Sequence, residues 1–230
     1  MGLKDEIQQQ VKATFQTDWS TRAGTVVPSD DSIKLSNDAV ELEATVLYAD
    51  MADSTKLVDG YKNWFAAAIY KTFLFSAAKI IRAEGGTITA YDGDRIMAVF
   101  IGGSKNTAAV RAGMKIKWAV DEIINPARLA KFANNQYIVK HVVGIDTSKL
   151  YVARTGVRGA NDLVWVGRAA NYAAKLSTLP ESYTYITKAV YDVMIDEVKL
   201  SNGTNMWTPV LWNNFDNSTI YRSHWRVPLI

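Results

Sequence analysis

Two aspartates, Asp50 and Asp94, are the residues of this sequence whose possible chemistry is easiest to define. Two carboxylates held side by side repel each other, and a divalent cation between them removes that cost. Ligands that offer only oxygen suit Mg²⁺ or Mn²⁺, which keep bound waters and take further oxygens from phosphate groups. Two such ions per site would activate a hydroxyl and neutralise a leaving pyrophosphate. The pair therefore predicts a metal site that acts on a nucleoside triphosphate, although either aspartate alone is more simply explained as a turn residue.

The order of the surrounding elements predicts that Asp50 and Asp94 meet. The sequence patterns indicate a strand at residues 40–50, a helix at 54–84 and two strands at 87–91 and 94–101. The first strand ends at Asp50, the helix returns the chain, and the third strand starts at Asp94 after a turn at Asp92-Gly93. A right-handed crossover leaves a gap beside the first strand that the third strand can fill. Both carboxylates then lie at the same end of neighbouring antiparallel strands.

The start of the helix that follows Asp50 is a candidate phosphate site. The residues there are Ala52, Asp53, Ser54 and Thr55. A helix N-terminus presents unpaired backbone N–H groups and a partial positive charge, and both suit a triphosphate. Asp53 or Ser54 also fits an ordinary N-cap, and the two roles are compatible.

The N-terminal region predicts a separate helix. Residues 5–17 carry one narrow apolar stripe of Ile7, Val11 and Phe15, which we expect to dock on the body or on a second subunit. Residues 18–38 contain several Gly, Pro, Asp and Asn residues, which are typical of a linker.

The rest of the chain predicts one α+β domain at 39–230, after an N-terminal helix and linker at 1–38. Its later elements are a helix at 106–124 with Pro126 just past its end, strands at 137–146, 150–157 and 162–166, a helix at 168–179, a strand at 183–187, a short helix and a C-terminal hairpin around 207–225.

The bulk composition excludes several classes of protein. The chain has 230 residues, a hydrophobic share of 48% and a net charge of +3, so it lacks the dense basic patch of nucleic-acid and membrane-surface binders. The absence of cysteine excludes disulfides and thiolate metal sites. No signal-peptide pattern and no stretch of about 18 apolar residues is found. We therefore expect a cytoplasmic protein that neither binds nucleic acid nor inserts into a membrane.

Four segments resemble motifs of the class III nucleotidyl cyclases, in the family's order. These segments are residues 46–55, 93–100, 143–145 and 167–176. The resemblance implies a ferredoxin-like antiparallel sheet with helices packed on it, and a head-to-tail homodimer with its sites at the interface. It also implies two Mg²⁺ or Mn²⁺ ions per site, held by Asp50, Asp94 and the Met51 backbone of one subunit.

The helix at 168–179 resembles the family's helix that contacts the ribose and the transition state from the other subunit. Asn171 matches the family's asparagine, whereas Lys175 stands where the family usually has arginine. Arginine and lysine are not equivalent for bidentate phosphate contacts. Arg168, Asn171 and Lys175 share one helix face. We expect Arg168 or Lys175 to supply the transition-state charge, with a solvent-facing basic stripe as the alternative.

The two positions that read the purine base in class III cyclases carry apolar residues here, Ala90 and Val164. Neither side chain can make the polar contacts that give most base discrimination. Tyr48, on the strand face of Asp50, and Arg95 are the remaining candidates for base contact. Tyr48 could instead be a core aromatic, and Arg95 a solvated cation. This combination resembles the pyrimidine cyclases of the Pycsar anti-phage systems.

The resemblance implies a cyclase that converts UTP to cyclic UMP and pyrophosphate, a second messenger read by a separate effector in anti-phage defence. Uracil is preferred to cytosine on the resemblance alone, because a tyrosine hydroxyl can donate to uracil O4 or accept from cytosine N4. Four alternatives stay open: CTP as the substrate, a purine cyclase with a divergent pocket, a non-catalytic nucleotide-binding domain, and a nucleic-acid-binding ferredoxin-like module. The presence of Asp50, Asp94 and Asn171 disfavours the third of these, and the weak net charge disfavours the fourth.

Overall fold

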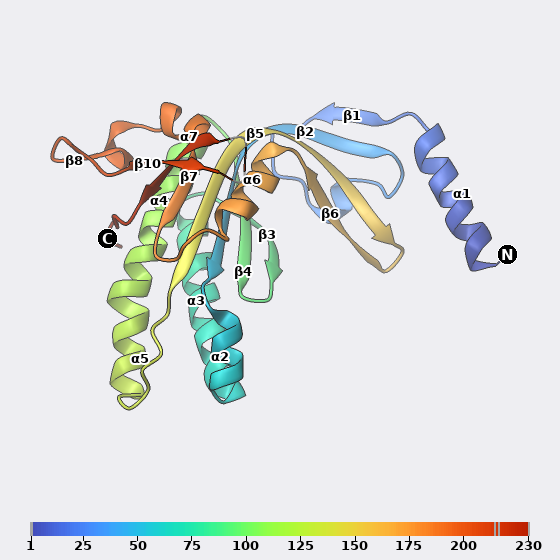
Figure 1. The fold of residues 1–230 in the computed structure, drawn as a ribbon. Coiled ribbons are helices and arrows are strands. Elements are labelled where there is room, and N and C mark those ends of the chain that lie inside the picture. Colours follow the sequence, from blue (N-terminus) through green and yellow to red (C-terminus); the bar gives the residue numbers. More distant parts are fainter. Residues whose placement is uncertain (1, 214, 216, 230) are drawn as a thin grey trace.

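The strands of the protein form one large sheet and one small hairpin (Figure 1). The computed structural model describes residues 2–213, 215 and 217–229. Its strands are β1 (Ser20–Ala23), β2 (Asp38–Met51), β3 (Thr87–Asp92), β4 (Arg95–Phe100), β5 (His141–Val157), β6 (Ala160–Val166), β7 (Thr184–Thr187), β8 (Leu200–Ser201), β9 (Thr204–Asn205), β10 (Thr208–Trp212) and β11 (Ser218–Ser223). Across these residues the large sheet has the order β10-β11-β7-β5-β2-β4-β3, with β1 beside β2 and β6 beside β5. The β1–β2 and β5–β7 pairs are parallel and the other pairs are antiparallel.

Helices cover both faces of the large sheet. They are α1 (Leu3–Gln16), α2 (Ser54–Gly60), α3 (Asn63–Ala83), α4 (Lys105–Ala119), α5 (Asn125–Lys131), α6 (Arg168–Leu176) and α7 (Lys188–Val193), with a π-helical turn at Val120–Ile124 and 3₁₀ turns at Asp30–Ser32 and Asp196–Val198. The long helices α3 and α4 lie on one face, and α6 lies on the other (Figure 1).

The alternation of side chains along β2 explains these layers, because successive residues of a strand point to opposite faces. Leu47 and Ala49 belong to the core formed with α3 and α4. Val46 and Tyr48 belong to a second apolar cluster with Ala169 of α6. The prediction that alternate residues of this strand share one face is therefore confirmed.

The segment from β2 to β5 has the ferredoxin-like arrangement, with β4 in the gap beside β2. β2 pairs with β4 on one side and with β5 on the other, so that Asp50 lies opposite both Arg95 and Val142. The expected α+β fold is confirmed, and its sheet is antiparallel apart from the two pairs named above.

Several predicted helices have different bounds. The helix expected at 54–84 is two helices, α2 and α3, because Tyr61 takes an extended conformation between them. The helix expected to end before Pro126 continues through the π-helical turn into α5. Pro126 lies in the first turn of α5, directly after the π-helical turn, so it does not end the helix. α6 ends at Leu176, three residues earlier than expected.

Asp94 lies in a turn, and the expectation that it begins a strand is wrong. Asp92 pairs with Arg95, so the two turn residues are Gly93 and Asp94 rather than Asp92 and Gly93. Gly93 has a φ of 60°, which glycine adopts without a steric penalty. The turn therefore leaves Asp94 at the tip of the hairpin, one residue before β4.

Two parts of the chain are more ordered than expected. The strands expected at 137–146 and 150–157 are one strand, β5, because residues 147–149 stay paired with β2. The segment at 18–38, expected to be a linker, contributes β1 to the large sheet. The domain boundary between residues 38 and 39 stays a prediction.

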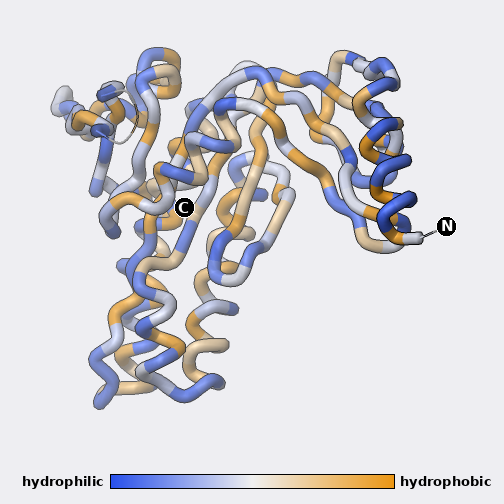
Figure 2. The backbone as a smooth tube through the Cα atoms, turned by 45° about the vertical axis from the view of Figure 1, so that its right-hand side comes forward, coloured by the Kyte–Doolittle hydropathy of each residue, from blue (hydrophilic) through white to orange (hydrophobic). Residues whose placement is uncertain are grey.

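The helix α1 projects from the side of the molecule opposite the C-terminus (Figures 1 and 2). None of its residues is buried, and the side chains of Ile7, Val11 and Phe15 are all exposed. Its C-terminal end is tied down by the Asn37 side-chain amide, which donates to the Thr14 carbonyl at 2.9 Å. Docking of α1 on its own body is therefore wrong, and docking on a second subunit stays a prediction.

The helix α3 is long and apolar enough to cross a membrane, judged by length and composition alone. The expectation that the sequence contains no such stretch is therefore wrong. In the structure, α3 buries Phe65, Ile69 and Phe73 in the core shared with the sheet. One apolar helix packed in this way has the pattern of a core helix.

Gly144 allows α6 to approach β5 closely. A Cβ atom at this position would lie 2.2 Å from the Ala173 carbonyl oxygen and 2.6 Å from the Ser177 backbone nitrogen. We expect Gly144→Ala to lower the free energy of unfolding by about 1–3 kcal/mol, because α6 must shift to relieve the clash. Urea unfolding measures the change, and Gly60→Ala is the control because nothing lies within 4 Å of its added methyl. Equal losses in the two variants would contradict the assigned contact.

Candidate active site

Asp50 and Asp94 lie at the same end of neighbouring strands. Asp50 is the penultimate residue of β2 and lies opposite Arg95 on β4. Asp94 immediately precedes Arg95 in the hairpin turn. Both side chains are half-buried. The predicted juxtaposition of the two aspartates is therefore present in the fold.

The charge environment of Asp50 fits a cation site. Burial, followed by the negative charge of Asp94, raises the pKa of Asp50 to about 6, with Arg95 only partly opposing the rise. A cation bound between the two carboxylates would remove this repulsion. In the described part of the chain, no cluster of three or more His, Asp or Glu side chains could hold a metal. Two carboxylates suffice for Mg²⁺ or Mn²⁺, which take their other ligands from water and phosphate.

The raised pKa of Asp50 predicts pH-dependent metal binding. The carboxyl must lose its proton to bind a cation, so affinity should fall as the pH drops below about 6. Because the folded pKa exceeds the ordinary 3.8, ionising Asp50 destabilises the metal-free fold as the pH rises between these values. Mn²⁺ should therefore raise the melting temperature more at about pH 7.5 than at about pH 5. An equal rise at both pH values, or an unchanged response in Asp50→Asn, would contradict this assignment.

An open cleft of roughly 430 Å³ lies beside Asp50 and is lined by the start of the following loop. Among the expected phosphate residues, the backbone N–H of Ala52 already donates to the Lys140 carbonyl at 3.0 Å. Asp53 adopts a left-handed conformation before α2, and its carboxylate pairs with Lys56 at 2.7 Å. The first turn of α2, with Ser54 and Thr55, has N–H groups without intrahelical acceptors.

The opposite wall of this cleft was missed by the sequence reasoning. It comprises residues 177–181, which follow α6. The Glu181 carboxylate in this wall forms an ion pair with the Lys140 ammonium at 3.1 Å. No local sequence pattern predicts this wall, because residues 177–181 lie near Asp50 only when α6 packs on the sheet.

The expected base-contacting residues of β2, β3 and β4 lie together. The Tyr48 hydroxyl lies 3.0 Å from the sulfur of Met97, and the Arg95 guanidinium lies over the Tyr48 ring at 5.2 Å. Ala90 is half-buried and packs in the same cluster as Tyr48. Arg95 also pairs with Asp92 at 2.9 Å. This surface is apolar, with one hydroxyl and one cation at its edge.

Val164 lies elsewhere, on β6. It is exposed, while its neighbours Leu163 and Trp165 pack in the cluster that includes Tyr48. Because successive residues of a strand alternate in direction, Val164 points away from that cluster. Within one chain, the structure does not bring Val164 to the base-contacting residues.

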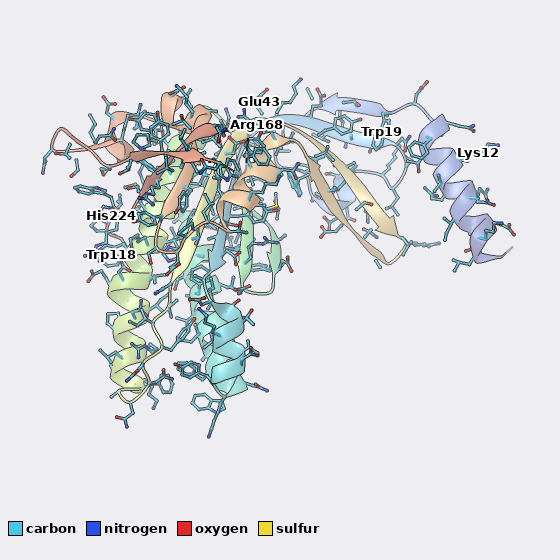
Figure 3. The ribbon with its side chains drawn as sticks, viewed as in Figure 1. Lys12, Trp19, Glu43, Trp118, Arg168 and His224 are labelled. Carbon is cyan, nitrogen blue, oxygen red and sulfur yellow. The ribbon has the colours of Figure 1, made fainter. Side chains whose placement is uncertain are left out.

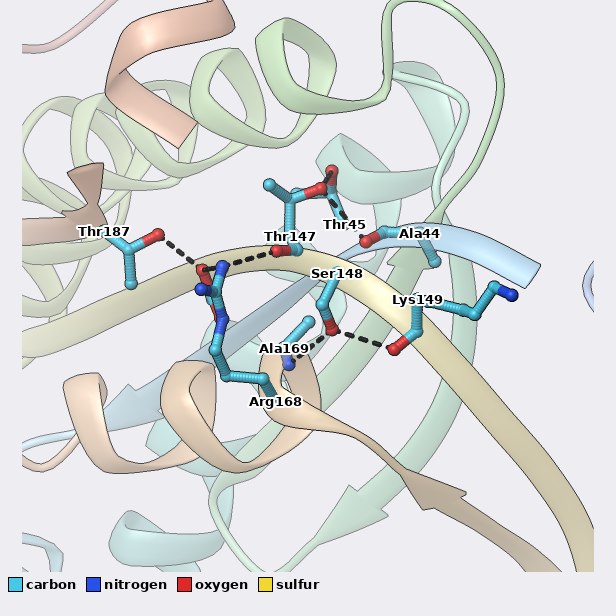
Figure 4. A network of polar contacts seen from close by, with 9 residues as sticks. Ala44, Thr45, Thr147, Ser148, Lys149, Arg168, Ala169 and Thr187 are labelled. Atoms are coloured by element: carbon cyan, nitrogen blue, oxygen red, sulfur yellow. Dashed lines mark hydrogen bonds and ion pairs between the residues drawn. The ribbon is translucent and has the colours of Figure 1, made fainter. Parts of the chain in front are cut away.

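Arg168, one of the two candidates for the transition-state charge, is labelled in Figure 3, and its polar contacts are drawn in Figure 4. It forms an ion pair with a buried carboxylate. Its guanidinium contacts the two carboxylate oxygens of Asp146 at 3.1 and 3.2 Å, and it donates to the Thr147 carbonyl at 2.9 Å. Asp146 lies opposite Val46 on β2, four residues, or about 13 Å, before Asp50. Arg168 is therefore anchored well away from the pair of aspartates.

The other two residues of the α6 face are exposed. Asn171 lies one turn after Arg168, and the Lys175 ammonium lies 4.0 Å from the centre of the Phe215 ring. Phe215 also packs edge-on against Tyr172. Within one chain, Arg168 is therefore held by Asp146, and Lys175 lies against Phe215.

The fold is that of the catalytic domains of nucleotidyl cyclases. The structure matches the guanylyl cyclase Cya2 with a TM-score of 0.69 at 19% identity, over 81% of this chain and 94% of that chain. It matches the adenylyl cyclase CyaB from P. aeruginosa with a TM-score of 0.68 at 21% identity, over 80% of this chain and 95% of that chain. No family model matches the sequence. The chain thus has the fold of the class III nucleotidyl cyclase domains.

Curated relatives define the family within this class. The chain is 62% identical to a uridylate cyclase from Xanthomonas perforans, with 98% of each chain covered. It is 51% identical to a uridylate cyclase from Burkholderia cepacia, over 98% of this chain and 99% of that protein. The protein belongs to the uridylate cyclase family.

Proposed function

We propose that this protein converts UTP to cyclic UMP and pyrophosphate. The observation that carries the proposal is the pair of half-buried aspartates, Asp50 and Asp94, on neighbouring strand ends, with the pKa of Asp50 raised by burial and by Asp94. The full-length similarity to proteins named uridylate cyclase supports the choice of base.

The proposed reaction is an internal displacement at the α-phosphorus. The ribose 3′-oxygen bonds to the α-phosphorus while the bond to the bridging oxygen breaks, so pyrophosphate leaves and the 3′-hydroxyl loses its proton. Asp50, Asp94 and the Met51 carbonyl would hold two Mg²⁺ or Mn²⁺ ions. When bound, these ions lower the pKa of the attacking hydroxyl and neutralise charge on the phosphates.

The phosphates are assigned to the cleft beside Asp50. The first turn of α2, with Ser54 and Thr55, offers backbone N–H groups toward phosphate oxygens. Asp53 helps to shape this turn through its left-handed backbone. Ala52 contributes by joining the loop to Lys140 through its backbone rather than by donating to the ligand.

The remaining residues of the site are assigned to a second copy of the chain in a homodimer. Asn171 is exposed, and Arg168 one turn earlier on α6 is held by Asp146, so we assign Asn171 to the site of the partner chain. In that arrangement Asn171 orients the ribose and Lys175 supplies positive charge to the transition state. The ion pair of Arg168 with Asp146 favours Lys175 over Arg168 for that charge.

The base is assigned to the surface formed by Tyr48, Ala90 and Arg95. The side chain of Ala90 forms a small apolar wall of this surface. Val164, the second base-reading position, would come from the partner chain. Neither side chain offers a hydrogen bond to a purine edge. Tyr48 and Arg95 can donate to a pyrimidine carbonyl. We expect Tyr48→Phe to lower kcat/KM for UTP by about 10-fold, the scale of one lost hydrogen bond to the substrate.

The control for the Tyr48→Phe prediction is Tyr191→Phe, a tyrosine on α7 that stacks on Tyr221 far along the sheet. It should leave kcat/KM unchanged. A wild-type value in Tyr48→Phe would remove its hydroxyl from base recognition, while leaving the cyclase assignment intact.

The test of the proposed function is a product assay with all four ribonucleoside triphosphates in competition, in the presence of Mn²⁺. Cyclic UMP should dominate. Cyclic CMP as the main product would move the substrate to CTP, and cyclic AMP or cyclic GMP would overturn the pyrimidine assignment. No cyclic product from any triphosphate would favour a non-catalytic nucleotide-binding domain.

We further propose that the enzyme works in the cytoplasm and that its product activates a separate effector protein in anti-phage defence. This role follows from the resemblance to the pyrimidine cyclases of anti-phage systems. Infecting cells that carry the gene, and measuring cyclic UMP before and after infection, tests it. A constant cyclic UMP level would contradict the defence role.

A further inference from the structure

Asp146 is a buried carboxylate that the reaction as described does not use. Its side chain has no exposed surface, and it directly follows the apolar run of residues 142–145. Thr187 on β7 donates its hydroxyl to one carboxylate oxygen, and Arg168 on α6 contacts both oxygens. Asp146 therefore joins three elements, β5, β7 and α6, at one point. Figure 4 labels its partners Arg168 and Thr187.

The contacts of Asp146 fix the first turn of α6. Besides pairing with Asp146, Arg168 donates to the Thr147 carbonyl, and the backbone N–H of Ala169 donates to the Ser148 hydroxyl at 2.9 Å. Three successive residues of β5 thus bind two successive residues of α6. A bidentate arginine–carboxylate pair sets orientation as well as distance.

The chemistry of the pair makes it sensitive to the loss of either partner. Burial raises the pKa of Asp146, while the hydrogen bond from Thr187 and the charge of Arg168 oppose that rise. Removing Arg168 would leave a buried carboxylate without its counterion, which is unfavourable. The Arg168 side chain is 46% exposed, so the pair holds a helix at the surface to a carboxylate in the interior.

The position of Asn171 depends on this contact. α6 has only nine residues, and Asn171 lies one turn after Arg168. The other end of α6 is held by close packing on Gly144. A rotation or slide of α6 at its first turn would therefore move Asn171, which has no burial of its own to hold it.

We infer that Asp146 is a positioning residue for the cyclase reaction, which acts through Arg168 to set the register of α6 and so places Asn171 and Lys175 against the substrate on the partner subunit. This inference rests on the proposed function, in which α6 serves the partner's site. It also changes the role of Arg168 from a source of transition-state charge to an anchor.

The first test compares steady-state kinetics of Asp146→Asn, Arg168→Met and the double variant, with UTP and Mn²⁺. Asp146→Asn should lower kcat by about 10- to 100-fold, the scale of a misplacement near 1 Å, and leave KM little changed. Arg168→Met should lose a similar factor, and the double variant should be no worse than the poorer single variant, because both remove one interaction. Asp192→Asn, which breaks the exposed pair with Lys188, is the matched control.

Thermal melting and size-exclusion chromatography show whether each variant folds and dimerises. If Asp146→Asn does not fold, Thr187→Val replaces it, because it removes one hydrogen bond to Asp146 and keeps the side-chain shape. A folded Asp146→Asn or Thr187→Val dimer with wild-type kcat overturns the inference. The inference is also overturned if adding Arg168→Met to Asp146→Asn lowers kcat by the full factor that Arg168→Met loses in the wild-type protein. Arg168 would then act on the substrate directly.

The second test uses mixed dimers to assign Asp146 to one half of the site. Asp146→Asn mixed with Asp50→Asn should recover activity, because each mixed dimer has one site with intact metal ligands and an intact α6. Asp146→Asn mixed with Asn171→Ala should stay at the residual level. The reverse result would place Asp146 on the metal side and overturn the inference. If Asp50→Asn mixed with Asn171→Ala fails to recover, the interface site of the proposed function is wrong, and the inference fails with it.

Discussion

Replacing Asp50 or Asp94 by asparagine is expected to lower cyclic UMP formation by on the order of 10³-fold or more. A single preorganised transition-state contact is commonly worth 10²–10³-fold, and each aspartate would supply negative charge for holding the ions. An amide has the same shape as a carboxylate but no charge to hold a divalent cation. Initial rates with saturating UTP and Mn²⁺ measure the loss.

The stability of the same variants separates a lost metal site from a lost fold. Because the metal-free protein holds Asp50 with a raised pKa, Asp50→Asn removes an unfavourable ionisation above about pH 6. Its melting temperature without metal should therefore equal or exceed the wild-type value, and the Mn²⁺-induced rise should vanish. Asp192→Asn should behave as wild type in both assays. Full activity in Asp50→Asn would contradict the metal site.

Mixing the inactive Asp50→Asn and Asn171→Ala chains is expected to restore about a quarter of the wild-type activity. Random association makes half of the dimers mixed, and each mixed dimer has one intact site of two, as the two-fold symmetry requires. Each variant alone should be almost inactive. The assay follows cyclic UMP after the chains are unfolded together and refolded, with separately refolded chains as the control.

No recovery on mixing would mean that Asp50 and Asn171 act in the same chain or in different reactions. Recovery well above a quarter would indicate preferential pairing of unlike chains. The predicted value depends on Asn171 acting on the aspartates of the other chain, whereas in its own chain Arg168 is held by Asp146 and Lys175 lies against Phe215. The experiment therefore tests the geometry of the site and whether two chains contribute residues to it.

The sequence alone was sufficient to predict that Asp50 and Asp94 meet. The alternation of residues 40–50 and the glycine of the hairpin turn are local signals. The crossover rule then leaves few ways to arrange three strands and one helix. The same alternation placed Tyr48 beside Asp50 on one face, where the structure also brings Ala90 and Arg95.

The tertiary structure decided the contacts that join distant parts of the chain. Arg168 shares a helix face with Asn171 in the sequence pattern, but its partner Asp146 lies 22 residues earlier in the chain and on another element. Pairing of this kind depends on how α6 packs against β5, and Gly144 sets that distance by leaving out a side chain. Helical periodicity cannot report such a distance, because it describes one element at a time.

Asp50, Asp94, Gly93 and Gly144 show which features follow from the sequence and which from the tertiary structure. The residue types of Asp50 and Asp94, and the order of strands around them, determine that oxygen ligands gather at one end of the sheet. The raised pKa of Asp50, the exact turn at Gly93 and the anchor of α6 arise only when burial and side-chain packing act together. Burial and packing depend on neighbours from the whole chain, so no local pattern contains them.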